Sequence, residues 1–465
     1  MTDFDFDFFY KEFSLQDKKD KFESETNKIN IDEKIVKILF DYQEKHLRNL
    51  INIIRNKDIV IDGSDTGTGK TYIAAALARY FKLKPFIVCP KAIMSSWKSV
   101  LKKFDILPLA IVNYETIKVG KYYINNSQDQ RKECPYIRIV KDEDNKKKFI
   151  WNLPPSSMLI FDEVHQCRKG NSQNTQLLLA SKKINCKKLL LSATLADSIE
   201  NFCIFGYMIN LYDNISKVNK WINSLESVNI LSEIHRKIYP FNGSRMKISE
   251  LGNKFQKNQI NVDIYDMDNS AYIQKEYGDI DSAIKQLKND DKNNNALNNI
   301  TKARQKIELL KIPTFIDLTK QYLDNKFSIV IFVNFRKTLE SLKKYLNTDC
   351  IIHGNQTINE REYNITKFLE NKEKIIICNI KAGGVGINLQ DKTGEFPRIS
   401  LISPTWSSTE LKQCLGRIHR ADSKSSTLQR IICCSNTIEE KICDRLNIKM
   451  SNINSINDGD LRPFL

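Results

Sequence analysis

The sequence predicts an α/β protein with two tandem domains, each built around a parallel sheet. Short β-rich runs alternate with helical stretches from Ile31 onward, which is typical of parallel sheets covered by helices on both faces. This alternation occurs in two series, separated by a polar segment. The chain has 465 residues, of which 41% are hydrophobic, so it can form two or three domains with sizeable cores.

The first part of the chain contains a leader and the first domain. Residues 1–30 are charged and include the repeated Asp-Phe of Asp3 to Phe8. We expect them to form a mobile leader, with a partner-binding peptide as the alternative. Residues 31–215 form the first expected domain. Its strands are predicted at 59–61, 86–89, 158–161 and 189–191. An Ala-rich helix is predicted at 71–81, between the first two strands.

The second part contains an insertion, the second domain and a tail. Residues 216–300 are polar and mostly helical in character, and they are predicted to be an insertion or linker. The second domain is expected at 301–450, followed by a tail at 451–465. Its strands are predicted at 329–333, 375–378, 399–402 and 428–434.

Charge and cysteine content narrow the class of protein. Lys and Arg number 72 against 56 Asp and Glu, a net charge of +16, which favours nucleic acid as a partner and an anionic membrane surface second. No apolar run approaches the ~18 residues of a membrane span, and Met1 to Tyr10 do not resemble a secretory signal. The 11 cysteines include no C-x-x-C pair, which indicates reduced thiols in the cytoplasm or nucleus.

Residues 63–71 form the strongest local motif, Gly-Ser-Asp-Thr-Gly-Thr-Gly-Lys-Thr, between an expected strand and an expected helix. Its glycines let the backbone curl so that N–H groups point at phosphate oxygens, and the helix N-terminus adds a positive dipole end. The lysine supplies a full charge to the β- and γ-phosphates, and the last hydroxyl can ligate Mg²⁺. The predicted nucleotide-binding residues are Thr66, Gly67, Thr68, Gly69, Lys70 and Thr71.

Two carboxylates complete the predicted site. The apolar run 158–161 ends in Asp162-Glu163-Val164-His165. Asp162, at the tip of a buried strand, is expected to hold Mg²⁺. Glu163 is expected to orient and deprotonate the attacking water, because phosphoryl transfer is catalysed mainly by positioning and charge. Together with the phosphate loop, this pair predicts hydrolysis of a nucleoside triphosphate.

These motifs resemble those of the superfamily-two helicases and translocases, and further motifs follow in the order of that family. The resemblance implies two RecA-like lobes, ATP and Mg²⁺ as cofactors, and nucleic acid as the partner. It implies that Gln43, in Tyr42-Gln43, recognises the adenine base. It also implies that His165, Ser192 and Thr194 couple the ATP site to the bound nucleic acid, which is the track along which such a motor moves. The further stretches that carry it are Cys89-Pro90-Lys91, Asn113-Tyr114-Glu115, Ser192-Ala193-Thr194 and Phe332-Val333-Asn334-Phe335.

Three stretches of the second domain resemble the SWI/SNF-type branch: residues 382–389, 413–420 and 437–442. Gln413, Arg417 and Arg420 are four and three positions apart, which predicts one face of a helix. By resemblance, the two arginines act as arginine fingers and Gln413 positions the water or the γ-phosphate.

The family resemblance also indicates which residues contact the track. The motif residues expected to touch nucleic-acid phosphates are Lys91, Asn334, Lys381 and Asn388. For each of these residues, ordinary surface exposure is the alternative.

The resulting functional prediction is a monomeric ATP-driven motor that translocates on double-stranded DNA. The alternatives are a DNA or RNA unwinding helicase acting in transcription, because Ser192-Ala193-Thr194 is the form common among unwinding helicases, and a non-catalytic nucleic-acid-binding scaffold. A composition rich in Asn, Ile and Lys is compatible with a large DNA virus as the source, which would add the virion to the expected locations.

Overall fold

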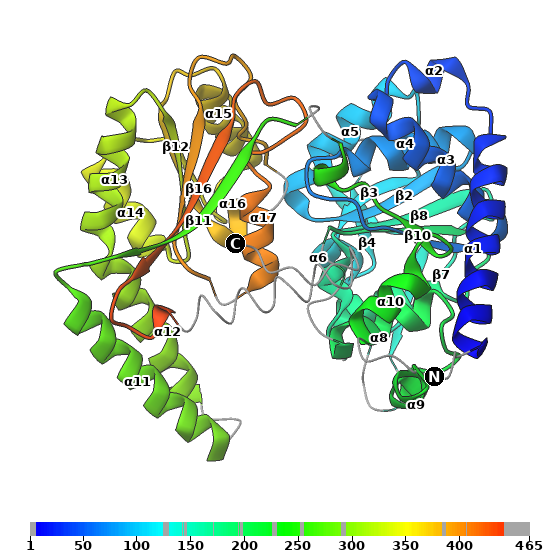
Figure 1. Cartoon of the computed structure of the whole chain (residues 1–465), viewed down its shortest axis with the longest axis horizontal. Coiled ribbons are helices and arrows are strands. Elements are labelled where there is room, and N and C mark those ends of the chain that lie inside the picture. Colours follow the sequence, from blue (N-terminus) through cyan, green and yellow to red (C-terminus); the bar gives the residue numbers. More distant parts are fainter. Residues whose placement is uncertain are drawn as a thin grey trace. The chain divides into compact units, whose positions relative to one another are not determined.

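The computed structural model divides the chain into two compact units (Figure 1). The first contains the described residues up to Leu251, and the second contains those from Phe255 to Glu440. The structure describes residues 6–123, 130–141, 143, 147–170, 172–193, 195, 199–225, 230–251, 255–289, 294–383, 387–405 and 407–440.

A six-stranded parallel sheet, ordered β10-β1-β9-β8-β2-β3, forms the centre of the first unit. Its strands are almost entirely buried, as expected for a sheet covered on both faces. The four strands predicted in this domain are confirmed, whereas β3 and β10 are short additions. The bounds are β1 (Ile59–Asp62), β2 (Lys84–Cys89), β3 (Ala110–Asn113), β8 (Ser157–Asp162), β9 (Lys187–Leu191) and β10 (Gly243–Ser244).

Helices cover both faces of this sheet and build two apolar cores. One core is formed with α3 (Asp41–Asn56), α4 (Lys70–Tyr80) and α5 (Met94–Lys103). The other is formed with α6 (Tyr114–Ile117), α7 (Gln173–Ser181), α8 (Ile199–Met208) and α10 (Ile230–Ile238). The remaining helices are α2 (Glu33–Val36) and α9 (Val218–Asn223), and two antiparallel hairpins pair β4 (Lys121–Tyr123) with β5 (Arg131–Glu133) and β6 (Ile137–Lys141) with β7 (Lys147–Trp151).

Most of the segment that we expect to be a leader is helical in the structure. Helix α1 (Phe6–Asn27) covers most of residues 1–30. Its C-terminal end packs on the first unit, where Asn52 Nδ2 donates to Thr26 Oγ1 at 3.1 Å and to the Phe22 carbonyl at 3.2 Å. The apolar residues of this helix do not repeat along one face, so periodicity alone gave no helical signal.

The second unit repeats the architecture with a parallel sheet ordered β11-β16-β15-β12-β14-β13. All four strands predicted in this domain are confirmed. The strands are β11 (Asn258–Tyr265), β12 (Ser328–Val333), β13 (Ile351–Ile352), β14 (Ile375–Asn379), β15 (Arg398–Ile402) and β16 (Thr427–Cys434). The helices are α11 (Ser270–Asn289), α12 (Asn294–Leu310), α13 (Ile312–Asp324), α14 (Arg336–Tyr345), α15 (Ile358–Leu369), α16 (Ile380–Gly383) and α17 (Ser408–Leu415).

The polar segment 216–300 is shared between the two units. Its first part contributes α9, α10 and β10 to the first unit, and β10 pairs with β1. Its second part contributes β11, α11 and α12 to the second unit, and β11 pairs with β16 along its whole length. Within the described ranges, no helix combines the length and apolarity needed to cross a membrane.

A buried ion pair holds the end of the second unit in place. Lys311 Nζ lies 2.7 Å from Glu439 Oε2, and the side chains are only 1% and 2% exposed. The remaining hydrogen-bonding capacity is used as well: Lys311 donates to the Ile432 carbonyl, and Glu439 accepts from Tyr277 Oη and the Cys434 N–H. A buried charge pair of this kind is stable only while both partners are present.

Replacing Lys311 by Met should therefore destabilise the second unit by about 3–5 kcal/mol, because the Glu439 carboxylate would stay buried without its counter-ion. Faster amide hydrogen exchange in peptides covering β12 and β16 would report the loss. The matched control is Lys306→Met, whose ammonium is 61% exposed and pairs with Glu276 at 3.0 Å. This control should cost under about 1 kcal/mol. Equal effects of the two substitutions would contradict the assigned role of the buried pair.

Candidate ATP site and nucleic-acid surface

The phosphate loop lies between β1 and α4, as predicted. Gly67 and Gly69 both have φ of 93°, in the left-handed region that glycine adopts without strain. A Cβ at Gly69 would lie 2.2 Å from Gln43 Nε2, so a side chain there would displace the glutamine. Thr68 is buried, and its hydroxyl donates to the Asp65 carbonyl at 2.8 Å. The loop therefore has a fixed curl that depends on glycine at position 69.

Gln43 contacts this loop directly. Its Nε2 donates to the Thr68 carbonyl at 2.7 Å, and its Oε1 accepts from the Phe40 N–H at 3.0 Å. The side chain is buried and connects the first turn of α3 to the phosphate loop. This contact shows a loop-positioning role for Gln43, while adenine recognition remains a prediction.

Lys70 is directed into the curl of the loop. Its ammonium donates to the carbonyls of Ser64 at 2.8 Å and Asp65 at 3.1 Å. Burial lowers the pKa of Lys70, and the nearby carboxylates of Glu163, Asp62 and Asp162 counteract this shift. The lysine therefore places its ammonium inside the loop, as the phosphate-binding prediction requires.

Arg245 is a loop-positioning residue that the sequence did not reveal. Its Nη1 donates to the Gly63 carbonyl at 2.6 Å, and its Nη2 lies 2.9 Å from Asp65 Oδ1. The other oxygen, Asp65 Oδ2, accepts from the Ile248 N–H at 3.0 Å. Arg245 follows β10 directly, so the pairing of β10 with β1 brings it to the loop.

A second buried network lies beneath the same loop. Asp62 Oδ1 accepts from the Ser64 N–H at 3.0 Å and lies 3.2 Å from His46 Nε2. The other ring nitrogen, His46 Nδ1, lies 3.0 Å from Ser244 Oγ on β10. Burial alone would raise the pKa of Asp62, but His46, Lys70 and Ser64 together keep it below its usual value. Asp62 is therefore ionised and fixes the start of the loop.

The predicted metal ligand Asp162 lies at the carboxyl end of β8 and is held from three directions. Trp97 Nε1 donates to its Oδ2 at 2.8 Å, and the Glu163 N–H donates to its Oδ1 at 2.9 Å. Tyr114 Oη donates to its backbone carbonyl at 2.9 Å. Burial and the adjacent Glu163 raise the pKa of Asp162 to about 7. Trp97 thus orients this carboxylate in addition to packing in the core.

Glu163 connects Asp162 to the predicted coupling residues. Its φ of 52° lies in the left-handed region, a strained conformation for a non-glycine residue that is common at functional sites. His165 Nδ1 lies 3.4 Å from Glu163 Oε2 and 3.1 Å from Ser192 Oγ. A polar chain therefore runs from β8 to the end of β9. Thr194, the third predicted coupling residue, lies outside the described residues.

The expectation that Gln413, Arg417 and Arg420 share one helical face was wrong. Helix α17 ends at Leu415 with Gly416 as its cap, so both arginines follow the helix. They are nevertheless held together. Arg417 Nη1 and Arg420 Nη2 both donate to the Ile387 carbonyl, at 3.2 and 3.4 Å, and Arg417 Nε donates to the Gln413 carbonyl at 2.9 Å.

Three of the four predicted nucleic-acid contacts are exposed. Lys91 follows β2, Lys381 lies in α16 after β14, and Asn388 lies in the segment before β15. Asn334 differs, because its Nδ2 donates to Glu308 Oε1 at 2.8 Å and to the Pro404 carbonyl at 3.0 Å. These bonds show that Asn334 shapes the loop after β12. A direct phosphate contact through its amide nitrogen is therefore less favoured, and the role of all four residues stays a prediction.

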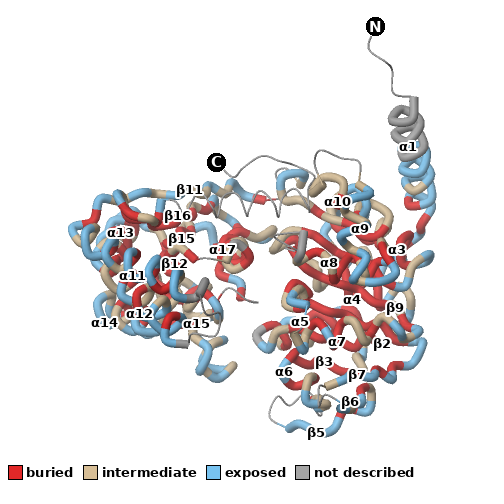
Figure 2. Tube along the Cα trace, turned by 90° about the horizontal axis from the view of Figure 1, so that it is seen from below, coloured by how far each residue is buried: buried red, intermediate tan, exposed pale blue. Residues whose placement is uncertain are grey.

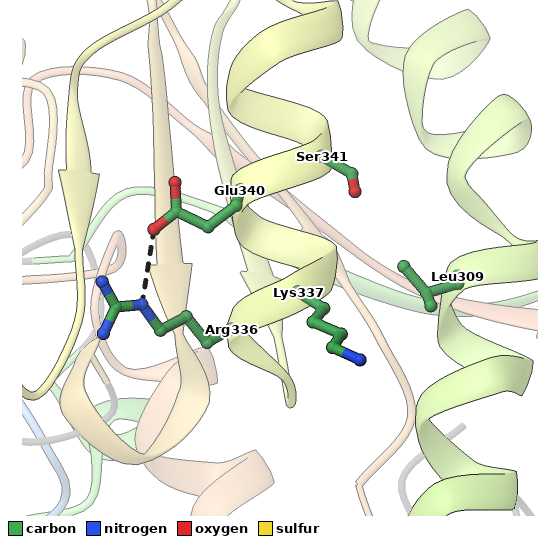
Figure 3. A pocket seen from close by; sticks show the side chains of 5 residues that line it. All are labelled: Leu309, Arg336, Lys337, Glu340 and Ser341. Carbon is green, nitrogen blue, oxygen red and sulfur yellow. Dashed lines mark hydrogen bonds and ion pairs between the residues drawn. The ribbon is translucent and has the colours of Figure 1, made fainter.

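An open pocket lies near Asn334, where α14 begins (Figure 3). Arg336 and Lys337 bring two cations to it, and Arg336 Nε donates to Glu340 Oε1 at 3.4 Å. The pocket is also lined by Leu309, Glu340 and Ser341. Parts of the SWI/SNF-like motifs, namely Gly384 to Gly386, Trp406 and the residues after Glu440, lie outside the described residues.

The contacts of Arg245 with Gly63 and Asp65, called here the Arg245 clamp, lead to a specific prediction. Arg245→Met keeps most of the side-chain volume but removes the hydrogen bonds to Gly63 and Asp65. Because the guanidinium is charged, each of these hydrogen bonds contributes about 1.5–3 kcal/mol. The loop should lose its fixed curl, and affinity for a fluorescent ATP analogue should fall about tenfold, or ~1.4 kcal/mol, in anisotropy titrations. Lys237→Met on α10, a half-exposed residue paired with Glu233, serves as the control and should bind normally. Unchanged affinity in the Arg245 variant would contradict the clamp.

Comparisons with known proteins match both units. Residues 37–197 match the family described as "Type III restriction enzyme, res subunit", and residues 311–422 match "Helicase conserved C-terminal domain". A protein of Acanthamoeba polyphaga mimivirus, named as an ATP-dependent RNA helicase, is 40% identical over 451 residues. The match covers 91% of this chain and 84% of the mimivirus protein.

A human SWI/SNF-related regulator of chromatin, subfamily A member 1, is 22% identical over 89% of this chain, which spans only 43% of that protein. The solved structure of S. cerevisiae Dbp5 bound to RNA and ADP BeF3 has a TM-score of 0.51 at 14% identity, with 92% of this chain and 93% of the other covered. This neighbour supports the fold of two tandem RecA-like units. The chain belongs to the superfamily-two helicases and is an ATP-dependent, nucleic-acid-stimulated enzyme of that family.

Proposed function

We propose that the protein is a motor that couples ATP hydrolysis to translocation on double-stranded DNA. The observation that carries the proposal is the grouping of Lys70, Asp162 and Glu163 around one phosphate loop, with Lys70 held by loop carbonyls and charge-coupled to both carboxylates. The SWI/SNF-like motifs of the second unit supply the preference for duplex DNA. A monomer is sufficient for this activity, because one chain carries both sets of motifs.

Mg²⁺ fits the chemistry of the residues present. Thr71 and Asp162 would hold it, and each Asp162 oxygen accepts one hydrogen bond from protein, which leaves lone pairs for a metal. A bound Mg²⁺ would neutralise charge on the phosphates. Glu163, tethered to His165, would orient and deprotonate the attacking water.

The arginines of the second unit complete the proposed mechanism. Arg417 and Arg420 would stabilise the charge that develops on the γ-phosphate, and Gln413 would help to position it. Their shared bond to the Ile387 carbonyl supports this role, because it holds the two guanidinium groups close together. Arginine fingers contribute on the order of a thousandfold in rate.

The Glu163–His165–Ser192 chain would transmit the state of the ATP site to the nucleic-acid surface. Lys91, Lys381 and Asn388 are the proposed contacts to phosphates on that surface, and their exposure supports this assignment. Binding through phosphates would be independent of sequence and sensitive to salt.

RNA unwinding is the second candidate function, favoured by two observations. The mimivirus relative is named as an RNA helicase, and Ser192-Ala193-Thr194 is the form common among unwinding helicases. Viral transcription would then be the setting, with the host nucleus, the cytoplasm or the virion as the location.

The track is tested by measuring ATPase stimulation with duplex DNA, single-stranded DNA and RNA of graded length. The proposal predicts stimulation that is specific for duplex DNA and grows with its length, because a translocating motor dissociates less often per cycle from a longer track. Stronger stimulation by RNA, together with strand separation of a labelled RNA duplex, would instead establish the unwinding function. The absence of any ATP turnover would leave only the scaffold alternative.

Glu163→Gln should lower kcat by at least about a hundredfold while ATP still binds, because the variant loses the base but keeps the phosphate loop. Lys70→Ala should lose both ATP binding and turnover. Phosphate release and ATP-analogue binding, measured on the same preparations, separate the two effects. Glu33→Gln, whose side chain is 88% exposed on α2, is the control and should behave as the unsubstituted chain does. Normal turnover in Glu163→Gln would remove Glu163 from the catalytic residues.

A further inference from the structure

The two hairpins β4–β5 and β6–β7 concentrate positive charge on the first unit. Residues 118–151 carry nine Lys or Arg and five Asp or Glu, so these 34 positions supply +4 of the net charge of +16. The charge is more one-sided on the strands themselves, where Glu133 is the one acidic residue. The basic residues on the strands are Lys121, Arg131, Lys132, Arg138, Lys141, Lys147 and Lys148.

The β6–β7 hairpin packs on the core of the first unit through one face. The inner face of β6–β7 carries Phe149 and Trp151, which are buried. Trp151 Nε1 donates to the Leu177 carbonyl at 3.0 Å, and its ring packs edge-to-face against Phe86 and Phe161. In Figure 2, β5 lies at the edge of the first unit and is drawn as exposed. Because side chains alternate along a strand, burial of one face turns the other toward solvent.

Cations on both faces of the β4–β5 hairpin lie next to aromatic rings, because Arg131 and Lys132 are consecutive and their side chains alternate. The Arg131 guanidinium lies 5.5 Å from the Tyr123 ring, and the Lys132 ammonium lies 5.5 Å from the Tyr122 ring. On β6–β7, Arg138 and Lys148 are exposed.

Several of these cations form no ion pair with any residue that the structure describes. Lys141 lies directly opposite Lys147 in the antiparallel register. Like charges at such positions are destabilising, which indicates that the arrangement serves a polyanionic partner better than it serves the fold. Among the described residues, no carboxylate forms an ion pair with Arg131, Lys132, Arg138 or Lys148.

The hairpins adjoin a motif that faces nucleic acid by family resemblance. Asn113, Tyr114 and Glu115 form that motif at the end of β3, and β4 follows within a few residues. Lys118 pairs with Glu115 at 3.3 Å, and Lys147 Nζ donates to the Lys118 carbonyl at 3.2 Å. The two hairpins therefore lie next to the motif that is expected to contact the nucleic acid.

From this arrangement we propose that the two hairpins form an additional binding surface for the phosphate backbone of nucleic acid, outside the motifs shared with the family. This inference rests on the proposed function, because it extends the track of the same motor. The surface binds phosphates through Lys132, Arg138 and Lys148 and makes no contact that distinguishes one base from another. It raises affinity for long nucleic acids without conferring sequence preference.

The test compares the triple variant Lys132→Ala/Arg138→Ala/Lys148→Ala with the unsubstituted chain. Binding of labelled 40-mers of duplex DNA, single-stranded DNA and RNA is titrated by anisotropy at several salt concentrations. The triple variant should bind about ten- to a hundredfold more weakly at ~0.1 M salt, and its slope of log K against log salt should fall by about 2–3, one phosphate contact per residue removed. Circular dichroism melting checks that the variant is folded.

A matched variant, Lys34→Ala/Lys37→Ala/Lys45→Ala, removes three exposed lysines from α2 and α3 of the same unit. It should leave the salt slope almost unchanged. Equal weakening in both variants would show a general effect of net charge and would overturn the inference, as would wild-type binding by the hairpin variant. Loss of binding to phosphatidylserine vesicles alone, with nucleic-acid binding retained, would assign the surface to a membrane and also overturn it. Failure of the unsubstituted chain to bind any of the three nucleic acids would refute the proposed function itself.

Discussion

The shape of the phosphate loop is the constraint on which the rest of the first unit depends. A chain that turns its N–H groups inward must find partners for its carbonyl oxygens elsewhere. The Gly63 carbonyl accepts from Arg245, the Thr68 carbonyl from Gln43, and those of Ser64 and Asp65 from Lys70. Two distant segments of the chain, which carry Gln43 and Arg245, therefore supply donors to one short turn in addition to its own lysine, so the turn depends on the folded unit.

Asp162, the predicted metal ligand, is likewise positioned by donors from separate segments of the chain. Asp162 is buried at the end of a central strand, where an unassisted carboxylate would resist ionisation, as its raised pKa shows. Trp97 from α5 and Tyr114 from α6 fix its orientation, so two helices that follow neighbouring strands act on one residue. Parallel sheets gather such groups because every strand ends at the same edge.

The amino-acid sequence was sufficient to predict eight of the twelve strands of the two sheets, the phosphate loop and the carboxylate pair, because each is encoded by consecutive residues. It was not sufficient for β3, β10 and β13, which are short, or for β11, whose eight residues lie in the segment that was predicted to be a mostly helical insertion. Arg245 and Asp65 are far apart in the chain, and no local signal links them. Counting of helical positions placed Arg417 and Arg420 on α17, but Gly416 ends that helix. Their convergence is instead produced by a backbone carbonyl of the preceding loop.

The membership of β10 in the first sheet has a consequence for how the protein can be dissected. A fragment ending at residue 215, where the sequence alone would place the lobe boundary, would lack β10 and leave the end of β1, at Ile61 and Asp62, without a neighbouring strand on that side. Unpaired strand edges promote self-association. A fragment extended to Leu251 keeps β10 paired with the end of β1, so the compact first unit is longer than the stretch that carries the recognisable motifs.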